Sequence, residues 1–470
     1  MKYIPTIGLE IHAELKTRSK MFCGCKNDPE EKSPNVNICP ICMAHPGALP
    51  AINKEAVKHV VKTGRALGGA IADFTEFDRK NYFYPDIPKG YQISQYKYPI
   101  VSEGNLNGIE ITRVHLEEDT ATSKHDRGEY SLLDFNRAGI PLMELVTEPV
   151  IHDAETAVRF AKELQLLLRY LGVSGANMEK GEMRVEANIS VSKTDSFGTK
   201  VEVKNLNSFK VVEKAIEYEI KRQSEKLERG EKIVQETRGW DEDREETFSQ
   251  REKESSHDYR YFPDPDLPKL KLSELSEFSA EVLKKEIPEP PWDKRRRLTE
   301  ILGIKNEAAE IFVTDSRLGN FFDEVAGKLA GRKEAILLAS NYITSDITSI
   351  LKNEDNNIPT VDSFVSLVKM LEEKVVSSRG AKDILAIMCR EGGEPNKIAE
   401  KGGLLQKSDQ SEIILIAKKI LGDNEKVVAE FKAGKESALQ YLIGQGMRAS
   451  RGSVNPQMLK KTFLYLLKEN

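Results

Sequence analysis

The chain has 470 residues, of which 31% are charged, and its formal net charge is -5. This length predicts two to four domains with an ample hydrophobic core. The near balance of charge excludes a general electrostatic attraction to nucleic acid or membrane, so any such binding must be local. The first residues lack the apolar run of a signal peptide, and no stretch reaches the roughly 18 apolar residues of a membrane span. We therefore expect a cytoplasmic protein.

The first predicted strand lies near the N-terminus and alternates polar with apolar side chains. Glu10, His12 and Glu14 share one face, and the apolar residues between them share the other. The same alternation returns in three later stretches, at 110–119, 184–191 and 200–204. We expect these strands to form an antiparallel sheet with a packed back and a polar front. That front is rich in Glu, His, Arg, Asn and Lys, as a divalent-metal and phosphate site requires.

Four of the five cysteines follow the first strand, with the spacing C-x-C-x13-C-x2-C. Two close pairs suit tetrahedral zinc, because each pair can supply two thiolates from one turn. Four reduced cysteines near a surface are the alternative. We favour zinc, and because thiolates would fill all four positions the metal would be structural. The predicted ligands are Cys23, Cys25, Cys39 and Cys42.

Two stretches combine aromatic and basic side chains with Pro and Gly. Residues 77–95 contain three Tyr and three basic residues, in a pattern that fits neither an amphipathic helix nor a regular strand. Residues 235–268 have the same character. Aromatic rings interleaved with cations can stack an adenine or a terminal nucleotide and hold phosphates, whereas a packed aromatic loop is the alternative. The presence of two such stretches favours the functional interpretation.

Helical patterns fill much of the remaining chain. Residues 153–171 and 208–229 each predict a long helix, opened by an N-capping side chain and closed by glycine. The proline-rich and then basic segment 287–297 predicts a linker. Helical periodicity then runs from 298 to about 403, with Gly-Gly breaks, and resumes from 405 to 470.

These patterns predict an α+β fold in three domains. An antiparallel-sheet domain at 1–290 is followed by two all-α domains, at 291–403 and at 404–470. In the tail from 405, basic residues outnumber acidic ones 11 to 7. Such an excess fits local contact with nucleic acid, although an ordinary solvated surface would also explain it. The basic residues include Lys418, Lys419, Lys435, Arg448, Arg451, Lys460 and Lys461.

Long motifs occur along the whole chain. They include GLEIHAEL at 8–15, SKMFCGC at 19–25, PGALP at 46–50, all of 77–95, HLEED at 115–119, KNLNSF at 204–209, QETR at 235–238, DYRYFPDPDLP at 258–268 and GKESALQYLIGQGMRASRGSVNP at 434–456. Together these motifs resemble the B subunits of glutamyl/aspartyl-tRNA amidotransferases from end to end.

The resemblance implies a fold and an activity. The fold would be a sheet like that of the glutamine synthetase catalytic domain. ATP and Mg²⁺ would be used to phosphorylate the side-chain carboxylate of Glu or Asp misacylated on tRNA, and ammonia would then displace phosphate. The ammonia would come from the amidase A subunit of a heterotrimer that also contains a small C subunit. The chain agrees, because it lacks a P-loop, a kinase signature set and an amidase nucleophile of its own.

The resemblance and the polar front together indicate the site residues. Magnesium prefers oxygen, so a histidine ligand either acts through a neighbouring ligand or favours manganese. The expected metal ligands are Glu10, His12, Glu117, Glu118 and Glu144. Lys80 and Tyr82 are expected beside the reacting carboxylate or phosphate. The expected nucleotide-binding residues are Arg184, Asn188, Lys204 and Arg238.

Two positions depart from the usual family pattern. The segment after HLEED reads TATSK where AGK is usual, so Lys124 need not occupy the usual lysine position. The segment 184–188 reads RVEAN where RCDxN is usual, which lengthens a carboxylate side chain. Two other functions stay open: a non-catalytic tRNA-binding adaptor subunit, and a carboxylate-amine ligase that acts on a free amino acid. ATP hydrolysis that depends on misacylated tRNA would separate these alternatives.

Overall fold

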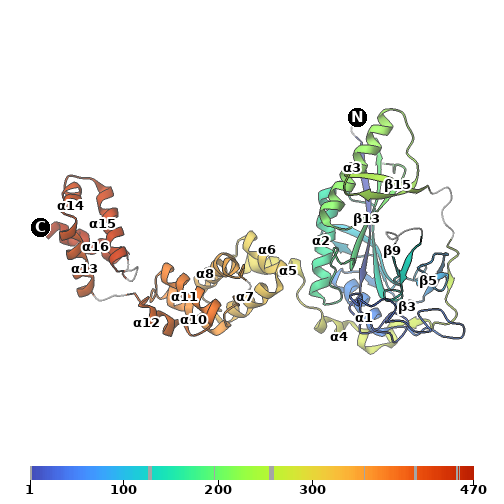
Figure 1. The fold of residues 1–470 in the computed structure, drawn as a ribbon, viewed down its shortest axis with the longest axis horizontal. Coiled ribbons are helices and arrows are strands. Elements are labelled where there is room, and N and C mark those ends of the chain that lie inside the picture. The colour runs from blue at the N-terminus through green and yellow to red at the C-terminus, as the bar shows by residue number, and fades with distance from the viewer. Residues whose placement is uncertain are drawn as a thin grey trace. The chain divides into compact units, whose positions relative to one another are not determined.

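The computed structural model describes residues 3–124, 130–194, 196–252, 259–353, 355–406, 410–450, 454 and 456–469 (Figure 1). The chain divides into two compact units between Pro291 and Trp292. The predicted division of the helical part at 403/404 stays a prediction. Within the described residues, no helix is both long and apolar enough to cross a membrane.

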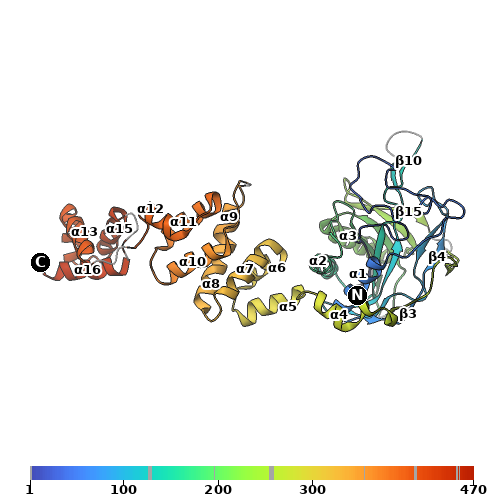
Figure 2. The same cartoon turned by 90° about the horizontal axis from the view of Figure 1, so that it is seen from below.

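The first unit is built on a ten-stranded sheet (Figures 1 and 2). Its strand order is β15-β14-β13-β12-β1-β11-β8-β6-β2, and β7 pairs with β8 outside that path. The strands are β1 (Ile4–Glu14), β2 (Ala70–Ile71), β6 (Val101–Ser102), β7 (Asn105–Leu106), β8 (Ile109–Glu118), β11 (Pro141–Thr147), β12 (Met183–Ser192), β13 (Val201–Leu206), β14 (Glu236–Asp241) and β15 (Glu246–Glu252).

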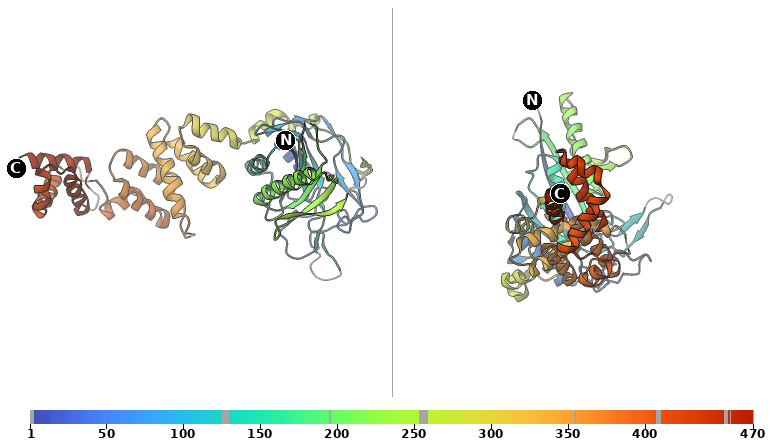
Figure 3. Two further views of the ribbon diagram at one scale, coloured as in Figure 1. Left: turned by 90° about the horizontal axis from the view of Figure 1, so that it is seen from above. Right: turned by 90° about the vertical axis from the view of Figure 1, so that its left-hand side faces the viewer.

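The helices pack on the back of this sheet (Figure 3), and the strand side chains on that face are apolar. Leu9, Ile11 and Ala13 of β1 are fully buried, as the alternation predicts. The helices α1 (Lys54–Ala66), α2 (Ala154–Tyr170) and α3 (Phe209–Glu228) contact strands of the sheet, and α2 also packs on α3. The predicted fold class, a sheet domain followed by helices, is confirmed.

The two predicted long helices begin and end close to the expected residues. Asp153 caps α2 by accepting a hydrogen bond from the backbone N–H of Thr156, and Ser208 caps α3 through the N–H of Val211. Helix α1 was not predicted. Its signal was the cap at Asn53 and an apolar stripe that repeats with helical period.

One pair of strands departs from the predicted antiparallel arrangement. Strand β14 runs parallel to β13, while the other neighbouring strands of the sheet run antiparallel. The reason is the connection, because α3 lies between these two strands in the chain. A strand that returns through a crossover helix pairs parallel to the strand it left.

Three small sheets flank the large one. Their pairs are β9 (Thr122–Lys124) with β10 (Leu132–Asp134), β4 (Asp78–Asn81) with β5 (Tyr91–Ser94) and β16 (Phe262–Pro263), and β17 (Leu270–Lys271) with β3 (Phe74–Thr75). The expectation that 77–95 contains no regular strand was wrong, because β4 and β5 pair in four-residue register across the Pro and Gly turn. Short helices η1 (Leu272–Glu274), η2 (Ser276–Phe278) and α4 (Ala280–Glu286) end the unit.

The described part of the second unit consists of helices and their connections, with one isolated β-bridge between Val376 and Leu405. Its elements are α5 (Pro291–Arg296), η3 (Arg297–Ile301), α6 (Asn306–Thr314), α7 (Ser316–Lys328), α8 (Lys333–Asn341), η4 (Tyr342–Ile347), α9 (Thr348–Ile350), α10 (Val361–Glu372), α11 (Ser378–Glu391), α12 (Pro395–Gly402), α13 (Gln410–Asp423), α14 (Glu425–Lys432), α15 (Glu436–Ala449) and α16 (Pro456–Glu469). The predicted linker 287–297 is therefore only partly extended, since Pro291 is compatible with the first turn of a helix.

Two groups of helices in this unit have apolar packing of their own. Phe312 and Phe322 stack with ring centroids 4.2 Å apart. Near the C-terminus, Leu442, Leu459 and Phe463 are fully buried in a cluster formed by α13, α15 and α16. The predicted Gly-Gly breaks occur where expected, after α11 and at the end of α12.

Candidate functional site

The polar front of the sheet brings charged side chains from four strands into one row. Strand pairing places His12 opposite Glu144 on one side and opposite Arg184 on the other, and Glu144 opposite His115. Residues opposite each other on neighbouring strands lie about 5 Å apart, so their side chains meet. The register also places Glu10 opposite Glu186.

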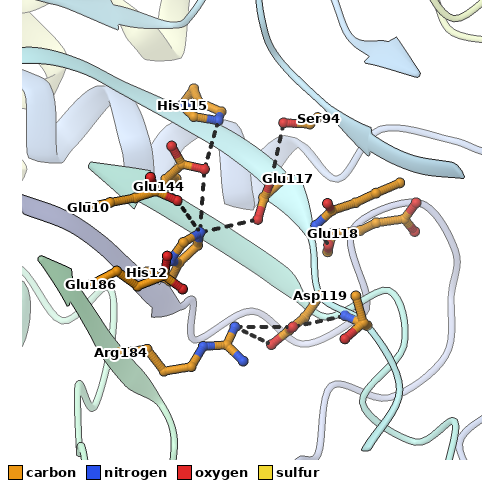
Figure 4. Close-up of polar contacts among 12 residues, drawn as sticks. Glu10, His12, Ser94, His115, Glu117, Glu118, Asp119, Glu144, Arg184 and Glu186 are labelled. Atoms are coloured by element: carbon orange, nitrogen blue, oxygen red, sulfur yellow. Dashed lines mark hydrogen bonds and ion pairs between the residues drawn. The ribbon is translucent and has the colours of Figure 1, made fainter. Parts of the chain in front are cut away.

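His12 lies at the centre of this arrangement (Figure 4). Its Nε2 atom is 3.4 Å from a carboxylate oxygen of Glu144, 3.5 Å from one of Glu117 and 3.7 Å from one of Glu10. The Nε2 atom of His115 lies 3.5 Å from the same Glu144 oxygen. Four of the five predicted metal ligands therefore come together.

Three overlapping groups have geometry suited to a metal ion. They are Glu10, His12 and Glu144; His115, Glu117 and Glu144; and Glu10, Glu186 and Glu202. In each group the ligand atoms lie within 4.8 Å of one another. The third group offers oxygen alone, which suits magnesium best. We refer to these seven residues as the carboxylate cluster.

Electrostatics shows how strongly the carboxylate cluster favours positive charge. Burial and the charges of Glu144 and Glu186 raise the pKa of Glu10 to about 7. Burial opposes protonation of His12, yet the hydrogen bond and charge of Glu144, together with Glu117, raise its pKa to about 9. Close carboxylates repel each other, so they hold protons unless a cation takes their place.

Lys80 and Tyr82 lie near Glu117 of the carboxylate cluster, and their place beside a reacting carboxylate or phosphate stays a prediction. The Nζ atom of Lys80 is 4.0 Å from a carboxylate oxygen of Glu117 and 5.3 Å from the centre of the Tyr259 ring. Burial disfavours the ammonium, but Glu117 raises the pKa of Lys80 well above its ordinary value. Burial also raises the pKa of Tyr82, which keeps its hydroxyl protonated.

Glu118 does not join the other predicted metal ligands. Its carboxylate accepts hydrogen bonds from Nζ of Lys89 at 2.6 Å and from the backbone N–H of Ile93 at 2.9 Å. Successive residues of a strand point to opposite faces, so Glu117 faces the front while Glu118 faces away from it. Glu118 therefore lies apart from the three groups of possible ligands, and its role as a metal ligand stays a prediction.

Arg184 lies in a separate group of charges at the edge of the site (Figure 4). Its guanidinium lies 3.2 Å from a carboxylate oxygen of Asp119, and Arg137 bridges Asp119 and Glu14. Burial works against ionisation of Asp119, but Arg184 and Arg137 lower its pKa to about 2. In this position, an anion that binds the Arg184 guanidinium would share it with the carboxylate of Asp119.

Asn188 and Lys204 lie on the front, next to the oxygen-only group. Lys204 contacts Glu186 at 2.8 Å and Glu202 at 3.6 Å. The Oδ1 atom of Asn188 is buried without a hydrogen-bond partner among the described residues, and Asn188 lines a cavity of about 220 Å³.

Arg238 does not lie on the front of the sheet, and its predicted contact with nucleotide stays a prediction. Thr237 donates its hydroxyl to Glu202 on the front, and the next residue of the strand consequently points to the helix-covered face. There the Arg238 guanidinium donates to Thr247 at 2.8 Å and lies 3.7 Å from the fully buried Glu219 of α3.

The four predicted zinc ligands also come together. The sulfur atoms of Cys23, Cys25, Cys39 and Cys42 all lie within 4.8 Å of one another. The hydrogen bond from Cys23 lowers the pKa of Cys42 to about 5, which favours a thiolate. The buried Lys20 side chain lies nearby and contributes to that lowering.

Three members of the carboxylate cluster were not predicted as ligands. Glu186 and Glu202 lie on the polar faces of predicted strands, and His115 begins the HLEED motif. Their signal was the alternation itself, because once the strand order is known the front-facing carboxylates of β12 and β13 fall beside Glu10, and His115 of β8 falls beside Glu144.

Comparisons with known proteins identify the family. Residues 5–276 match the GatB/GatE catalytic domain, and residues 320–467 match the GatB domain. The chain belongs to the GatB family. It is 42% identical to the B subunit of the aspartyl/glutamyl-tRNA(Asn/Gln) amidotransferase of Thermodesulfovibrio yellowstonii, with all of both chains covered. It is 43% identical to the protein of the same name from Dehalococcoides mccartyi, over 98% of this chain and 99% of that one. The resemblance of the motifs to GatB proteins is thus confirmed.

Proposed function

We propose that the chain is the B subunit of a tRNA-dependent amidotransferase and carries its ATP-dependent step. The substrate would be Glu or Asp esterified to the wrong tRNA, and the product Gln-tRNA(Gln) or Asn-tRNA(Asn). The observation that carries this proposal is the carboxylate cluster at the front of the sheet, in a chain similar to amidotransferase B subunits over its full length.

The donor atoms of the carboxylate cluster fit Mg²⁺. Glu10, Glu186 and Glu202 would hold it through oxygen alone, and the groups around His12 and His115 would hold a second cation. Bound metal would neutralise the phosphate oxygens of ATP and the charge that develops on them during transfer.

The reaction proceeds in two balanced steps. A side-chain carboxylate oxygen of the esterified amino acid attacks the γ-phosphorus of ATP, the bond to ADP breaks, and an acyl phosphate forms. Ammonia then attacks the acyl carbon, a C–N bond forms, the C–O bond to phosphate breaks, and the amide remains while hydrogen phosphate leaves with one proton from ammonia. Lys80 would orient the attacking carboxylate, because its ammonium is permanently charged beside Glu117. Tyr82 would donate its protonated hydroxyl to the same group or to the phosphate.

The base and ribose of ATP would occupy the cavity of about 220 Å³ beside Gly8, Asn188 and Phe197. Asn188 is two residues from Glu186 on the same face of β12, so a nucleotide in this cavity places its phosphates toward the metal ligands. The orphaned Oδ1 atom of Asn188 is a ready acceptor for an amino or hydroxyl group. Lys204, which borders the oxygen-only group, would contact phosphate.

The other parts would support this step. Ammonia would arrive from the amidase A subunit, with which the chain and a small C subunit would form a heterotrimer. The four cysteines would hold structural Zn²⁺, and the buried ammonium of Lys20 would offset part of the charge of four thiolates. The helical tail would bind tRNA. Arg451, one of its predicted basic residues, lies outside the described residues.

Formation of ADP by the reconstituted heterotrimer tests the proposal. ADP should form with misacylated Glu-tRNA(Gln) or Asp-tRNA(Asn), and should not form with the uncharged tRNAs or with free amino acids. Turnover with free glutamate would identify a carboxylate-amine ligase instead. Tight binding of tRNA without consumption of ATP in any combination would identify a non-catalytic adaptor.

A further inference from the structure

A row of four tyrosines connects the surface to the carboxylate cluster. Tyr96 and Tyr261 stack with ring centroids 4.3 Å apart and planes 9° from parallel. Tyr261 meets Tyr259 edge to face at 6.0 Å, and Tyr259 meets Tyr82 in the same way at 6.0 Å. The outer ring, Tyr96, is 62% exposed. The row thus unites the two aromatic and basic stretches that the sequence shows 140 or more residues apart.

The inner end of this row lies at the reacting centre. Lys80 is 5.3 Å from the centre of the Tyr259 ring and 4.0 Å from Glu117. Burial raises the pKa of Tyr261 to about 12, and the charges of Glu117 and Glu144 act in the same direction. A group stacked on these rings therefore lies within reach of the site where a carboxylate would be phosphorylated.

The backbone that carries Tyr259 and Tyr261 is held in an uncommon conformation. Arg260, which is exposed and lies between Tyr259 and Tyr261, has a φ of 45°. The side-chain amide of Asn81 donates to the carbonyl oxygens of Tyr259 at 3.2 Å and Arg260 at 2.9 Å. Left-handed backbone at a residue other than glycine persists only where its surroundings enforce it, and such positions concentrate at functional sites.

We propose that this tyrosine row binds the unpaired terminal nucleoside at the 3′ end of the aminoacyl-tRNA, an inference that rests on the proposed function. An aromatic row with adjacent cations is the chemistry that holds single-stranded nucleic acid, because every base offers a face for stacking. The amino acid is esterified to the terminal ribose, so anchoring that nucleoside on Tyr261 and Tyr96 would bring the side-chain carboxylate toward Lys80.

ATP also carries a base that could stack on the tyrosines. The layout of the site distinguishes the two possible ligands, ATP and the terminal nucleoside of tRNA. The cavity proposed for ATP adjoins Gly8 and Asn188, close to Glu10 and Glu186. The tyrosines approach the carboxylate cluster at Glu117, through Lys80 of β4. In-line transfer requires the attacking carboxylate and the departing ADP on opposite sides of the transferred phosphorus. The tyrosine row therefore binds the tRNA that carries the attacking carboxylate, and not ATP.

Binding of uncharged tRNA(Gln) to the full heterotrimer, followed by fluorescence anisotropy, tests the inference. The probes are the intact transcript and the same transcript without its terminal nucleoside. Removal of the nucleoside should weaken binding to the unaltered enzyme by roughly tenfold, as expected for loss of one stacked base. Tyr96→Ala and Tyr261→Ala should weaken binding of the intact transcript by a similar factor and should not change binding of the shortened one. Tyr261→Phe should retain most of the affinity.

Tyr130→Ala is the matched control, since Tyr130 is 61% exposed and Tyr96 is 62% exposed. This variant should bind both transcripts as the unaltered enzyme does. Equal losses on both transcripts in the Tyr96→Ala variant would overturn the inference, and weakened ATP binding with unchanged tRNA binding would assign the row to ATP. If removal of the terminal nucleoside weakens tRNA binding but no ADP forms in the presence of misacylated tRNA, the binding site is supported and the proposed function is rejected.

Discussion

Glu144 belongs to two of the three overlapping ligand groups that make up the carboxylate cluster. Its carboxylate faces both His12 and His115, whose charges hold its pKa well below the usual range although burial acts against this. It stays ionised where Glu10 is half protonated at neutral pH, because the pKa of Glu10 is about 7. Glu144 therefore keeps its negative charge at neutral pH, whereas Glu10 does so only in part.

Glu144→Gln should lower the rate of tRNA-dependent ADP formation by about a hundredfold or more, the size typical of losing one group that stabilises charge at a reacting centre. Gln keeps the shape of the side chain and removes its charge. The rate is measured with saturating misacylated tRNA, and Glu110→Gln, an exposed position on β8, serves as the control. Near-normal turnover by Glu144→Gln would exclude this residue from the site.

The separation of Glu118 from the carboxylate cluster gives a second test. Mg²⁺ that binds the folded chain should raise its melting temperature, because ligands of the native state stabilise it by mass action. Glu144→Gln should reduce this rise, whereas Glu118→Gln should keep it, since Glu118 contacts Lys89 and Ile93 instead. Loss of the magnesium-dependent rise in the Glu118→Gln variant would contradict the arrangement.

Strand β14 is held on the helix-covered face by a buried network of charges. Arg238 and Arg222 both face Glu219, a residue of α3 without solvent exposure. On the opposite face of the same strand, Thr237 holds Glu202 of the carboxylate cluster with a hydrogen bond of 2.8 Å. The network thus fixes a strand whose other face touches a proposed metal ligand.

Arg238→Met should lower the free energy of unfolding of the sheet unit by about 3 to 5 kcal/mol, because it leaves the buried Glu219 with less compensation. Arg229→Met, at an exposed ion pair with Glu231 after α3, should change the stability far less, because water screens an exposed pair. Trp240 of β14 can report unfolding in a Trp292→Phe background, since the chain has two tryptophans. Equal stability of the two arginine variants would show that the network contributes little.

The four-cysteine segment should carry about one zinc ion per chain, by the stoichiometry of tetrahedral sites. Removal of the metal should lower the melting temperature more than it lowers the turnover of the remaining folded enzyme, since the cysteines lie outside the carboxylate cluster. Elemental analysis of freshly purified, reduced protein checks the first statement. Absence of metal there would contradict it, and Cys389→Ser, away from the segment, should leave the zinc content unchanged.

Local patterns predicted the elements, and long-range order explains what they missed. Alternation along β1 and β12 placed Glu10, His12 and Arg184 on the front, because side-chain direction depends only on strand period. The face on which Arg238 lies was not predicted, because the face of β14 depends on the parallel crossover through α3, which the residues around it do not encode. Glu118 was within reach of the sequence, since a neighbour of Glu117 in a strand has to face the other way.

The helical unit allows its contribution to be tested by truncation. A chain that ends after residue 403 should retain the whole sheet unit, which forms its own compact body at 1–291. It should bind ATP as the full chain does, yet bind tRNA more weakly and with a shallower dependence on salt, because fewer phosphates are neutralised. Fluorescence anisotropy at several salt concentrations gives both quantities. Unchanged affinity and salt slope would assign tRNA recognition to the first 403 residues.

The position of β1 in the large sheet has a consequence for how the protein is made. Residues 4–14 leave the ribosome well before their partners, because β11 and β12 lie at 141–147 and 183–192. The central strand β1 can therefore pair with both of its neighbours only after β12, at 183–192, has been synthesised. Pairings so distant along the chain form slowly, and unpaired apolar strands invite aggregation in the meantime. The helices of the second unit contact mostly helices close to them in the chain, so we expect them to fold soon after they are synthesised.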